Sequence, residues 1–143
     1  MIQIREISKK DAESVAWLST QLGYESDIEQ ISARIKHINN SNDNCAFVAL
    51  FEDKVVGWIH GFYTLRIESD PFVEIGGLIV DSAYRNLKIG KQLIERLKLW
   101  AEQHQVKKLK VRCNIIRTES HKFYERLGFK DNKRQIAFEI DLD

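Results

Sequence analysis

The sequence predicts an α/β protein with one mixed sheet, antiparallel in its first part and parallel later, flanked by about four helices. The chain has 143 residues, which suits one domain over residues 1–143 with a core large enough to enclose a cleft. A hairpin pattern in the first half requires antiparallel pairing. A strand-helix-strand pattern in the second half requires a parallel pair joined by a crossover.

The N-terminal segment predicts a strand followed by a helix. Residues 2–7 alternate apolar and polar side chains, which is typical of a half-buried strand. Ser8 with Asp11 three positions later forms a capping-box pattern, so we expect a helix to begin there. Apolar residues then recur at helical spacing until Gly23, which is placed as a C-terminal cap.

A second helix and a hairpin follow. Ser26 with Glu29 repeats the capping signal, and four isoleucines behind it form one narrow apolar stripe. The chain then predicts a loop over 39–44. Two runs rich in β-branched and aromatic residues, 45–51 and 55–65, are separated by a short charged turn. This arrangement is typical of a β-hairpin.

A third strand-like run covers residues 72–80 and reads FVEIGGLIV. Adjacent glycines, here Gly76 and Gly77, are unusual inside a regular strand. They indicate either a β-bulge or a backbone that another group approaches closely.

The second half predicts a helix, a strand, a second helix and closing strands. The first helix covers about 90–104 and the strand 107–114. Thr118 is placed to cap the second helix, which should stop at Gly128. Residues 129–143 end in alternating IAFEIDL, so one or two further strands are expected there.

Composition excludes several classes of function. Lysine plus arginine exceeds aspartate plus glutamate by 22 − 21 = 1, so nothing points to nucleic acid or an anionic membrane. No apolar run approaches the roughly 18 residues that cross a bilayer. Cys45 and Cys113 lack paired spacing and the four histidines are scattered, so we expect no disulfide and no metal. A soluble, cytoplasmic protein is the expectation.

The segment 84–91 has the character of an anion site. It lies between a strand and a helix, so its backbone amides should converge at the helix N-terminus, where phosphate groups bind. Arg85 and Lys91 add positive charge. The pattern GxxxxGK[ST] is absent, so this is not a Walker loop.

This segment resembles the cofactor loop of the GCN5-related N-acetyltransferase (GNAT) family, which is written [Q/R]xxGx[G/A]. Arg85 and Gly90 match the ends of that pattern, while Lys88 replaces its first glycine. A glycine there can serve a positive φ angle, which Lys88 would adopt at some cost. The neighbouring GGLIVDSAYR and the later RTESHKFYERLGF also look like the family's strand and helix, so the resemblance is specific between about Glu74 and Phe129.

The resemblance implies an acyl-CoA N-acyltransferase fold and acetyl-CoA as co-substrate. In the family the central strand splays from its parallel neighbour and offers backbone groups to the pantetheine arm, and the loop holds the pyrophosphate. Asn114 would face the pantetheine region. The cofactor-binding residues implied by similarity are Leu78, Ile79, Val80, Arg85, Asn86, Leu87, Lys88, Ile89, Gly90, Lys91 and Asn114.

The resemblance also implies two catalytic residues. An amine with a pKa of about 10.4 is mostly protonated at neutral pH, so transfer needs a base. Glu74 stands at the family's strand glutamate and is the expected base; a solvated strand residue is the alternative. Tyr124 is the expected proton donor to the departing thiol, and an aromatic in an apolar helix stripe is its alternative.

A covalent route through Cys113, with His121 as its base, competes with direct transfer. Cys113 shares strand parity with Leu109 and Val111, and a free cysteine commonly behaves as a small buried hydrophobe. Direct attack in a ternary complex is therefore the favoured mechanism.

The acceptor is an amine of a small molecule or a protein, and the sequence does not rank the candidates. Trp17, Trp58, His60 and the turn 22–25 are placed to border an acceptor pocket. Core packing is the favoured role of the tryptophans, and a hydrogen-bonded strand histidine that of His60. Glu25, Glu68 and Asp70 either attract a cationic amine or are simply solvated.

Two other functions compete with the enzyme. Because Lys88 departs from the family's loop, a noncatalytic acyl-CoA sensor or interaction module with the same fold stays open. A nucleotide-binding domain of another kind would need a triphosphate or dinucleotide fingerprint that the chain lacks. A homodimer is a further expectation, since family members often pair through edge strands or C-terminal elements.

Overall fold

The structure is a computed structural model that describes residues 1–142. The chain divides into two compact units, Met1–Val111 and Arg112–Asp143, and each is described by itself. The elements of the first unit are β1 (Ile2–Glu6), the 3-10 turn η1 (Lys9–Asp11), α1 (Ala12–Thr20), α2 (Ile28–Asn39), β2 (Asn44–Phe51), β3 (Lys54–Thr64), β4 (Phe72–Val80), the 3-10 turn η2 (Ser82–Tyr84), α3 (Ile89–Gln103) and β5 (Leu109–Val111). The second unit contains α4 (Thr118–Arg126).

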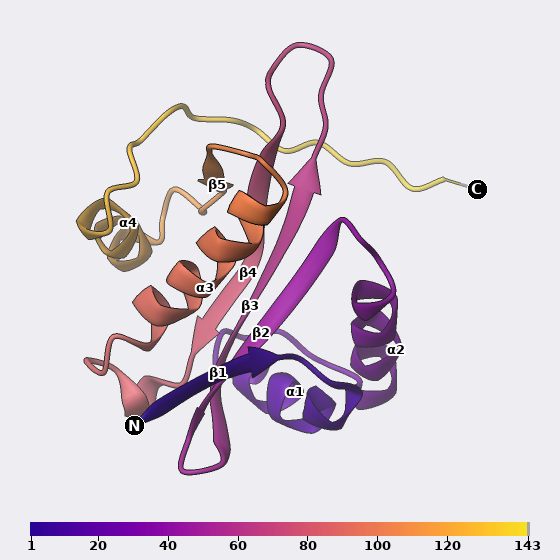
Figure 1. Cartoon of the computed structure of the whole chain (residues 1–143), viewed down its shortest axis with the longest axis vertical. Coiled ribbons are helices and arrows are strands. Elements are labelled where there is room, and N and C mark those ends of the chain that lie inside the picture. The colour runs from indigo at the N-terminus through magenta and orange to yellow at the C-terminus, as the bar shows by residue number, and fades with distance from the viewer. Residues whose placement is uncertain (143) are drawn as a thin grey trace. The chain divides into compact units, whose positions relative to one another are not determined.

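The first unit is built on a five-stranded sheet in the order β1-β2-β3-β4-β5 (Figure 1). The first four strands pair antiparallel with their neighbours in sequence, and β5 joins β4 in parallel. The turn between β2 and β3 consists of Glu52 and Asp53, both at positive φ, which matches the twist of a tight hairpin. The predicted mixed α/β sheet is confirmed.

Helices cover both faces of this sheet. One apolar cluster joins α1 and α2 to the inward side chains of β2, with Trp58 of β3 packed against it. Adjacent strand residues point to opposite faces, and Gly57, next to Trp58, lies against Leu93 of α3. The helix α3 therefore covers the face opposite α1 and α2, as Figure 1 shows. The guanidinium of Arg96 on α3 lies 4.4 Å from the Phe47 ring centroid.

The glycine pair in β4 marks a β-bulge, as the sequence predicted. On β3, His60 and Gly61 are consecutive, but their partners on β4 are Gly77 and Ile75. Gly76 is therefore the extra residue. An added Cβ at Gly76 would lie 2.6 Å from Nδ1 of His60, and one at Gly77 would lie 2.7 Å from the Trp58 ring. Both sequence interpretations hold, because the strand bulges and aromatic rings lie directly on its backbone.

Several helix starts differ from the sequence prediction by one residue. The Ser8 capping box is confirmed, since both of its hydrogen bonds form. The second box is wrong: Asp27, not Ser26, caps α2, and its carboxylate accepts from the backbone N–H of Glu29 and of Gln30. Thr118 lies inside α4, whose N-cap is Arg117, and the side chain of Arg117 makes no capping hydrogen bond to the helix. Short polar residues at neighbouring positions compete for the same cap, and spacing alone does not decide between them.

The predicted closing strands do not form within residues 129–142. The apolar residues of this segment are largely exposed, from 79% for Ile136 to 90% for Phe138 and Leu142. Alternation shows which side chains would share a buried face, but a strand also needs a neighbour that accepts its hydrogen bonds. The pattern was therefore real and the inference from it was wrong.

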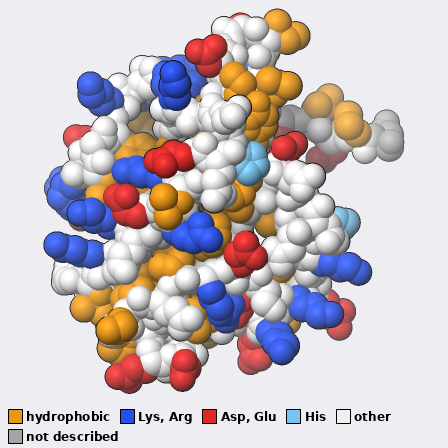
Figure 2. Space-filling view, in the orientation of Figure 1, with side chains coloured by type: hydrophobic (Ala, Val, Ile, Leu, Met, Phe, Trp, Pro, Cys, Tyr) orange, Lys and Arg blue, Asp and Glu red, His pale blue; other side chains and the backbone are white. Residues whose placement is uncertain are grey.

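Among the helices of the described chain, none is long and apolar enough to pass through a bilayer. Lysine, arginine, aspartate and glutamate side chains are interspersed over the face seen in Figure 2. No described group of three histidine, cysteine, aspartate or glutamate residues is arranged to hold a metal ion.

Candidate active site

The first half of β4 carries the predicted base, Glu74. Residues Val73, Glu74 and Ile75 pair with β3 on one side and with Leu109–Val111 of β5 on the other. Val73 and Ile75 are buried, whereas Glu74 points to the opposite face and is half-buried. Its strand partners are Phe62 and Lys110. Glu74 is thus held rigidly by a doubly paired strand.

The second half of β4, Leu78–Val80, has a different environment. It pairs with Ile59, Trp58 and Gly57 of β3, but the parallel ladder with β5 ends at Ile75. Within the first unit, no described strand pairs with these residues on the β5 side. Backbone groups of a strand alternate between its two sides, so some of those in 78–80 point away from β3. The strand β4 therefore extends beyond the end of its parallel partner, and the splay that the family resemblance implies stays a prediction.

The strand continues directly into the predicted anion loop. Residues 85–88 connect η2 to α3, and Ile89 and Gly90 are buried in the first turn of that helix. The first amides of an α-helix have no acceptor within the helix, and a 15-residue helix carries a positive N-terminal pole. Lysine and arginine side chains at the loop are all exposed: Arg85, Lys88 and Lys91. These groups suit a diphosphate.

The predicted cost at Lys88 is real. Lys88 is the N-cap of α3 and adopts left-handed angles of φ 59° and ψ 29°. Asn86, two residues earlier, also has a positive φ of 72°. A left-handed conformation costs a residue with a side chain about 1–2 kcal/mol, with asparagine among the more tolerant. The loop therefore keeps the conformation that a glycine would adopt freely, with a cation in its place.

The residues around the predicted acceptor pocket divide between core and surface. Trp58 packs in the α1–α2 core, as expected, whereas Trp17 is 53% exposed, so its predicted core role is wrong. His60 donates from Nε2 to Oδ1 of Asn44 at 2.8 Å, which confirms a hydrogen-bonded strand histidine. Burial lowers the pKa of His60, so its ring is neutral at neutral pH.

Two buried or bridging residues escaped the sequence analysis. Asp81, directly after β4, is only 2% exposed, and its carboxylate caps η2. Gln21, at the end of α1, donates to that carboxylate. An aspartate followed by Ser82 and Ala83 after a strand is a capping signal that could have identified the first residue. No local pattern identifies the second, because the two residues lie 60 positions apart.

The remaining predicted residues, Asn114 and Tyr124, lie in the second unit. The side-chain oxygen of Asn114 accepts from the backbone N–H of Ile116 at 3.0 Å, and its carbonyl accepts from Nε2 of His121 at 2.8 Å. A carbonyl cannot donate, so Nε2 carries the proton in this bond. Asn114 therefore shapes the turn before α4, and His121 is engaged with backbone there.

Tyr124 lies on α4 between two phenyl rings. Its ring centroid is 5.1 Å from that of Phe123 and 5.4 Å from that of Phe129, both in edge-on geometry. Burial, and secondarily the nearby Cys113 thiol, raise the pKa of Tyr124 to about 12. The phenol is thus fully protonated at neutral pH, which a proton donor requires.

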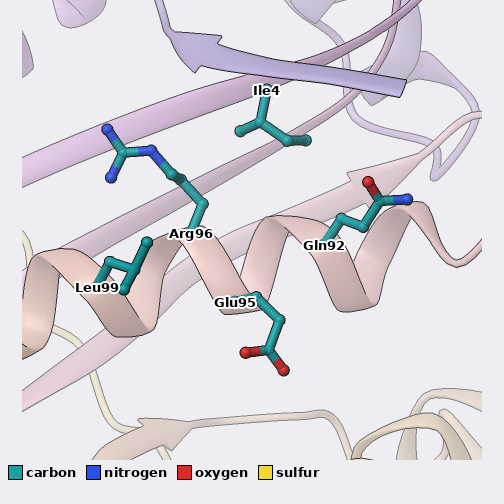
Figure 3. Close-up of a pocket in the computed structure, with 5 residues that line it drawn as sticks. All are labelled: Ile4, Gln92, Glu95, Arg96 and Leu99. Atoms are coloured by element: carbon teal, nitrogen blue, oxygen red, sulfur yellow. The ribbon is translucent and has the colours of Figure 1, made fainter. Parts of the chain in front are cut away.

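A hollow of about 350 Å³ lies elsewhere on the first unit, between β1 and α3. Figure 3 shows its lining residues, with Ile4 of β1 above the helix and Glu95 directed away from that strand. The strands β2 and β3 separate β1 from β4 in the sheet. This hollow therefore lies at β1 and not at β4, although its lining residue Gln92 donates from Nε2 to the carbonyl of Leu87 in the predicted anion loop at 3.4 Å.

Comparison with known proteins identifies the family of this fold and site. A family model described as the acetyltransferase (GNAT) family matches residues 4–129. The chain therefore belongs to the acetyltransferase (GNAT) family. The predicted family and fold are confirmed. The expected transfer of an acetyl group agrees with the description of that family.

Similar proteins include an N-acetylaspartate synthetase and an aminoglycoside acetyltransferase. N-acetylaspartate synthetase of Xenopus tropicalis is 32% identical over 105 residues, which cover 73% of this chain and 35% of that protein. The chain thus spans about a third of the length of that relative. Aminoglycoside N(6')-acetyltransferase type 1 of Salmonella enteritidis is 24% identical over 143 residues, covering 96% of this chain and 97% of that protein.

Solved structures of similar fold include aminoglycoside acetyltransferases. AAC(6')-Iy in complex with the bisubstrate analogue CoA-S-monomethyl-acetylneamine matches with a TM-score of 0.87 at 21% identity, covering 99% of each chain. AAC(6')-Ih from Acinetobacter baumannii matches with a TM-score of 0.87 at 16% identity, covering 100% of each chain. At these identities the likeness establishes the fold.

Proposed function

We propose that this protein transfers the acetyl group of acetyl-CoA to a primary amine by direct attack in a ternary complex. One observation carries the proposal: β4 loses its parallel partner after Ile75 and runs directly into a helix N-terminus flanked by exposed cations. A strand with outward backbone groups suits the amides of pantetheine, and a helix N-terminus suits a diphosphate. The open strand and the helix N-terminus are adjacent, as are the pantetheine arm and the diphosphate in a CoA molecule.

The residues of the loop and strand would divide the co-substrate between them. Backbone amides from Arg85 to Lys91 would hold the diphosphate, with the cations of that segment adding charge. Leu78, Ile79 and Val80 would bind the pantetheine arm, and an amide there would polarise the thioester carbonyl. Acetyl-CoA itself supplies an activated acyl group with a thiolate leaving group. In the second unit, Asn114 is proposed to face the pantetheine.

Glu74 is proposed as the general base. A lysine-like amine must lose a proton before attack, and at pH 7 this costs roughly 4–5 kcal/mol. The Glu74 carboxylate would take that proton, directly or through water, before the amine nitrogen attacks the acyl carbon. The nitrogen would lose a second proton to water as the tetrahedral intermediate collapses to the amide. The nitrogen lone pair forms the new bond, and the electron pair of the broken C–S bond leaves with sulfur.

Tyr124 is proposed as the general acid. The departing thiolate needs one proton, and the Tyr124 phenol still carries one at neutral pH because burial raises its pKa to about 12. This step matters less than deprotonation of the amine, since a thiol with a pKa near 8.5 is already a tolerable leaving group. A covalent acyl-cysteine route is disfavoured, because His121 uses Nε2 to bind the Asn114 carbonyl.

Acetyl-CoA consumption against a panel of amines tests the proposal. The panel contains an aminoglycoside, aspartate, a polyamine and a lysine peptide, and release of CoA thiol is recorded. Glu74→Gln should lower kcat about 10²-fold or more, and Tyr124→Phe about tenfold, with acetyl-CoA affinity retained. Glu102→Gln, an exposed glutamate at the end of α3, is the matched control and should leave turnover unchanged.

The alternative is a noncatalytic acyl-CoA sensor or interaction module. The left-handed conformation of Lys88 is the observation that supports this alternative. A strained loop with a positive charge can still bind CoA in a protein that has lost catalytic activity. Such a protein would bind acetyl-CoA in calorimetry and release no thiol above the uncatalysed rate with any amine. Turnover that depends on Glu74 would exclude the sensor.

The setting and assembly of the protein are part of the same proposal. Cys45 and Cys113 are both free thiols, which favours a reducing, cytoplasmic compartment. The net charge of +1 gives no reason to expect a nucleic-acid partner. A homodimer is proposed from the family resemblance alone, and light scattering of the purified protein tests it.

A further inference from the structure

A reciprocal pair of hydrogen bonds joins the end of α1 to the start of the cofactor loop. The Gln21 side chain donates from Nε2 to Oδ1 of Asp81 at 3.3 Å, and its Oε1 accepts from the backbone N–H of Ser82 at 3.2 Å. One amide thus supplies a donor to Asp81, the N-cap of η2, and an acceptor to Ser82, the first residue of η2. Neither a carboxylate nor an apolar side chain of the same size can make both bonds.

Asp81 is the fixed point of this contact. Its backbone N–H donates to the Val56 carbonyl on β3 at 2.8 Å, and its own carbonyl accepts from Tyr84 at 3.0 Å. Its Oδ1 also accepts from the backbone N–H of Ala83 at 3.0 Å, while its buried Oδ2 has no hydrogen-bond partner in the described chain. Asp81 therefore ties the sheet, η2 and Gln21 together four residues before Arg85.

A second contact joins the same two segments. The Lys54 ammonium, in the β2–β3 hairpin, lies 5.8 Å from the ring centroid of Trp17 on α1 and 5.4 Å from that of Tyr84 on η2. Such cation–π contacts hold an exposed cation between two rings with modest energy. The helix α1 and η2 are therefore linked by two separate sets of contacts.

The chain beyond Gln21 is the turn predicted to border the acceptor. Leu22 and Tyr24 are 41% and 55% exposed, and Gly23 has a φ of +84°. The backbone of this turn is held by bonds to the last residues of α1, such as Tyr24 N–H to the Ser19 carbonyl at 3.3 Å. Its position thus depends on how α1 ends, and Gln21 is where that end is anchored.

We propose that Gln21 is a positioning residue that couples the cofactor loop to the acceptor turn 22–25. This proposal rests on the proposed function. Binding of acetyl-CoA at 85–91 would restrict the motion of η2. Through the hydrogen bonds of Gln21, the turn 22–25 would become more rigid as well, and the affinity for the amine would rise. Linkage is reciprocal, so bound acceptor would tighten acetyl-CoA equally.

Amide hydrogen exchange of the peptide covering 20–27, with and without CoA, tests the coupling. In the wild type, CoA should slow exchange of this peptide. In Gln21→Met, calorimetry should give a Kd for CoA within about threefold of the wild-type value, but CoA should no longer slow hydrogen exchange of the 20–27 peptide. The KM for the amine should rise about fivefold or more, with kcat little changed. Gln30→Met, at an exposed glutamine of α2, should behave as wild type.

Each other outcome has a distinct meaning. Slowed exchange and an unchanged amine KM in Gln21→Met would overturn the coupling, as would a wild type that binds CoA with no change in 20–27. A wild type that does not bind CoA at all would instead refute the proposed function. Gln21→Glu keeps an acceptor for the backbone N–H of Ser82, but its carboxylate would repel that of Asp81. This variant should therefore also lose the coupling. It serves as a control for effects that are specific to the methionine side chain.

Discussion

The two halves of β4 have the same neighbour on one side and different surroundings on the other. Val73–Ile75 are paired with both β3 and β5, whereas Leu78–Val80 are paired with β3 alone among the strands of the first unit. The bulge at Gly76 separates them. A strand held on both sides can fix a catalytic carboxylate, and a strand held on one side keeps backbone groups for a ligand. In the proposed function, one strand would therefore hold both the base and the co-substrate.

The largest effect should come from filling the bulge. In Gly76→Val, the new side chain would meet the His60 ring, whose Nδ1 lies 2.6 Å from the position of the added Cβ. We expect a loss of about 1–3 kcal/mol in the free energy of unfolding, as is typical of overpacking. Acetyl-CoA affinity should fall at least tenfold, because Leu78–Val80 would be displaced. Urea denaturation and calorimetry measure the two losses.

A double-mutant cycle separates this clash from a general weakening of the strand. His60→Ala removes the ring, so Gly76→Val should cost less stability in that background than in the wild type. Equal costs in both backgrounds would mean that His60 does not set the geometry of the bulge.

A smaller effect is expected at the loop that follows the second half of β4. Lys88→Gly removes the left-handed cost and also removes a charge, so the melting temperature should rise by a few degrees while acetyl-CoA affinity falls by about threefold. Lys88→Gln keeps the left-handed cost and should lose the same affinity with no gain in stability. Unchanged affinity in both variants would show that the Lys88 charge does not contact the diphosphate.

A pH dependence of stability should arise at His60, beside the bulge. Burial lowers the pKa of His60 in the folded state, so protons bind the unfolded chain more tightly. The contribution of His60 to the free energy of unfolding is therefore fully present above its pKa in the unfolded chain, about 6.5. This contribution is lost as the pH falls through the pKa of His60 in the folded protein. Urea denaturation at pH 7.5 and 5.5 should show a larger loss in the wild type than in His60→Gln. Parallel losses would contradict this account.

The smallest effect is expected at the cysteines. Direct transfer predicts that Cys113→Ala keeps kcat within about twofold, because no acyl-cysteine forms. Burial raises the pKa of Cys45 to about 12, so in Cys113→Ala no thiol should react rapidly with a disulfide reagent at pH 8. A collapse of turnover in Cys113→Ala with an intact fold would restore the covalent route.

Local patterns predicted the loop and the bulge better than they predicted the end of the chain. The loop could be found because the start of α3, the charges and the left-handed position are all encoded within 85–91. The glycine pair revealed the bulge for the same reason. In contrast, the alternation of 136–142 specifies a strand only when a partner strand is present, and sequence does not provide one.

Contacts between distant segments also escaped prediction. The Gln21 and Asp81 side chains meet because α1 and the end of β4 are brought together by the fold, and neither residue carries a local signal of that meeting. Trp17 was expected in the core on composition, yet it lies at the surface near Lys54. Tertiary context decided both cases.

The division of β4 and its loop can be tested by following backbone amide resonances during titration with two ligands. Pantetheine should shift the amides of Leu78–Val80 alone. CoA should shift those amides together with the amides of 85–91, because only CoA carries the diphosphate. The same response to both ligands at 85–91, or shifts that avoid both segments, would contradict the assignment of this strand and loop to acetyl-CoA.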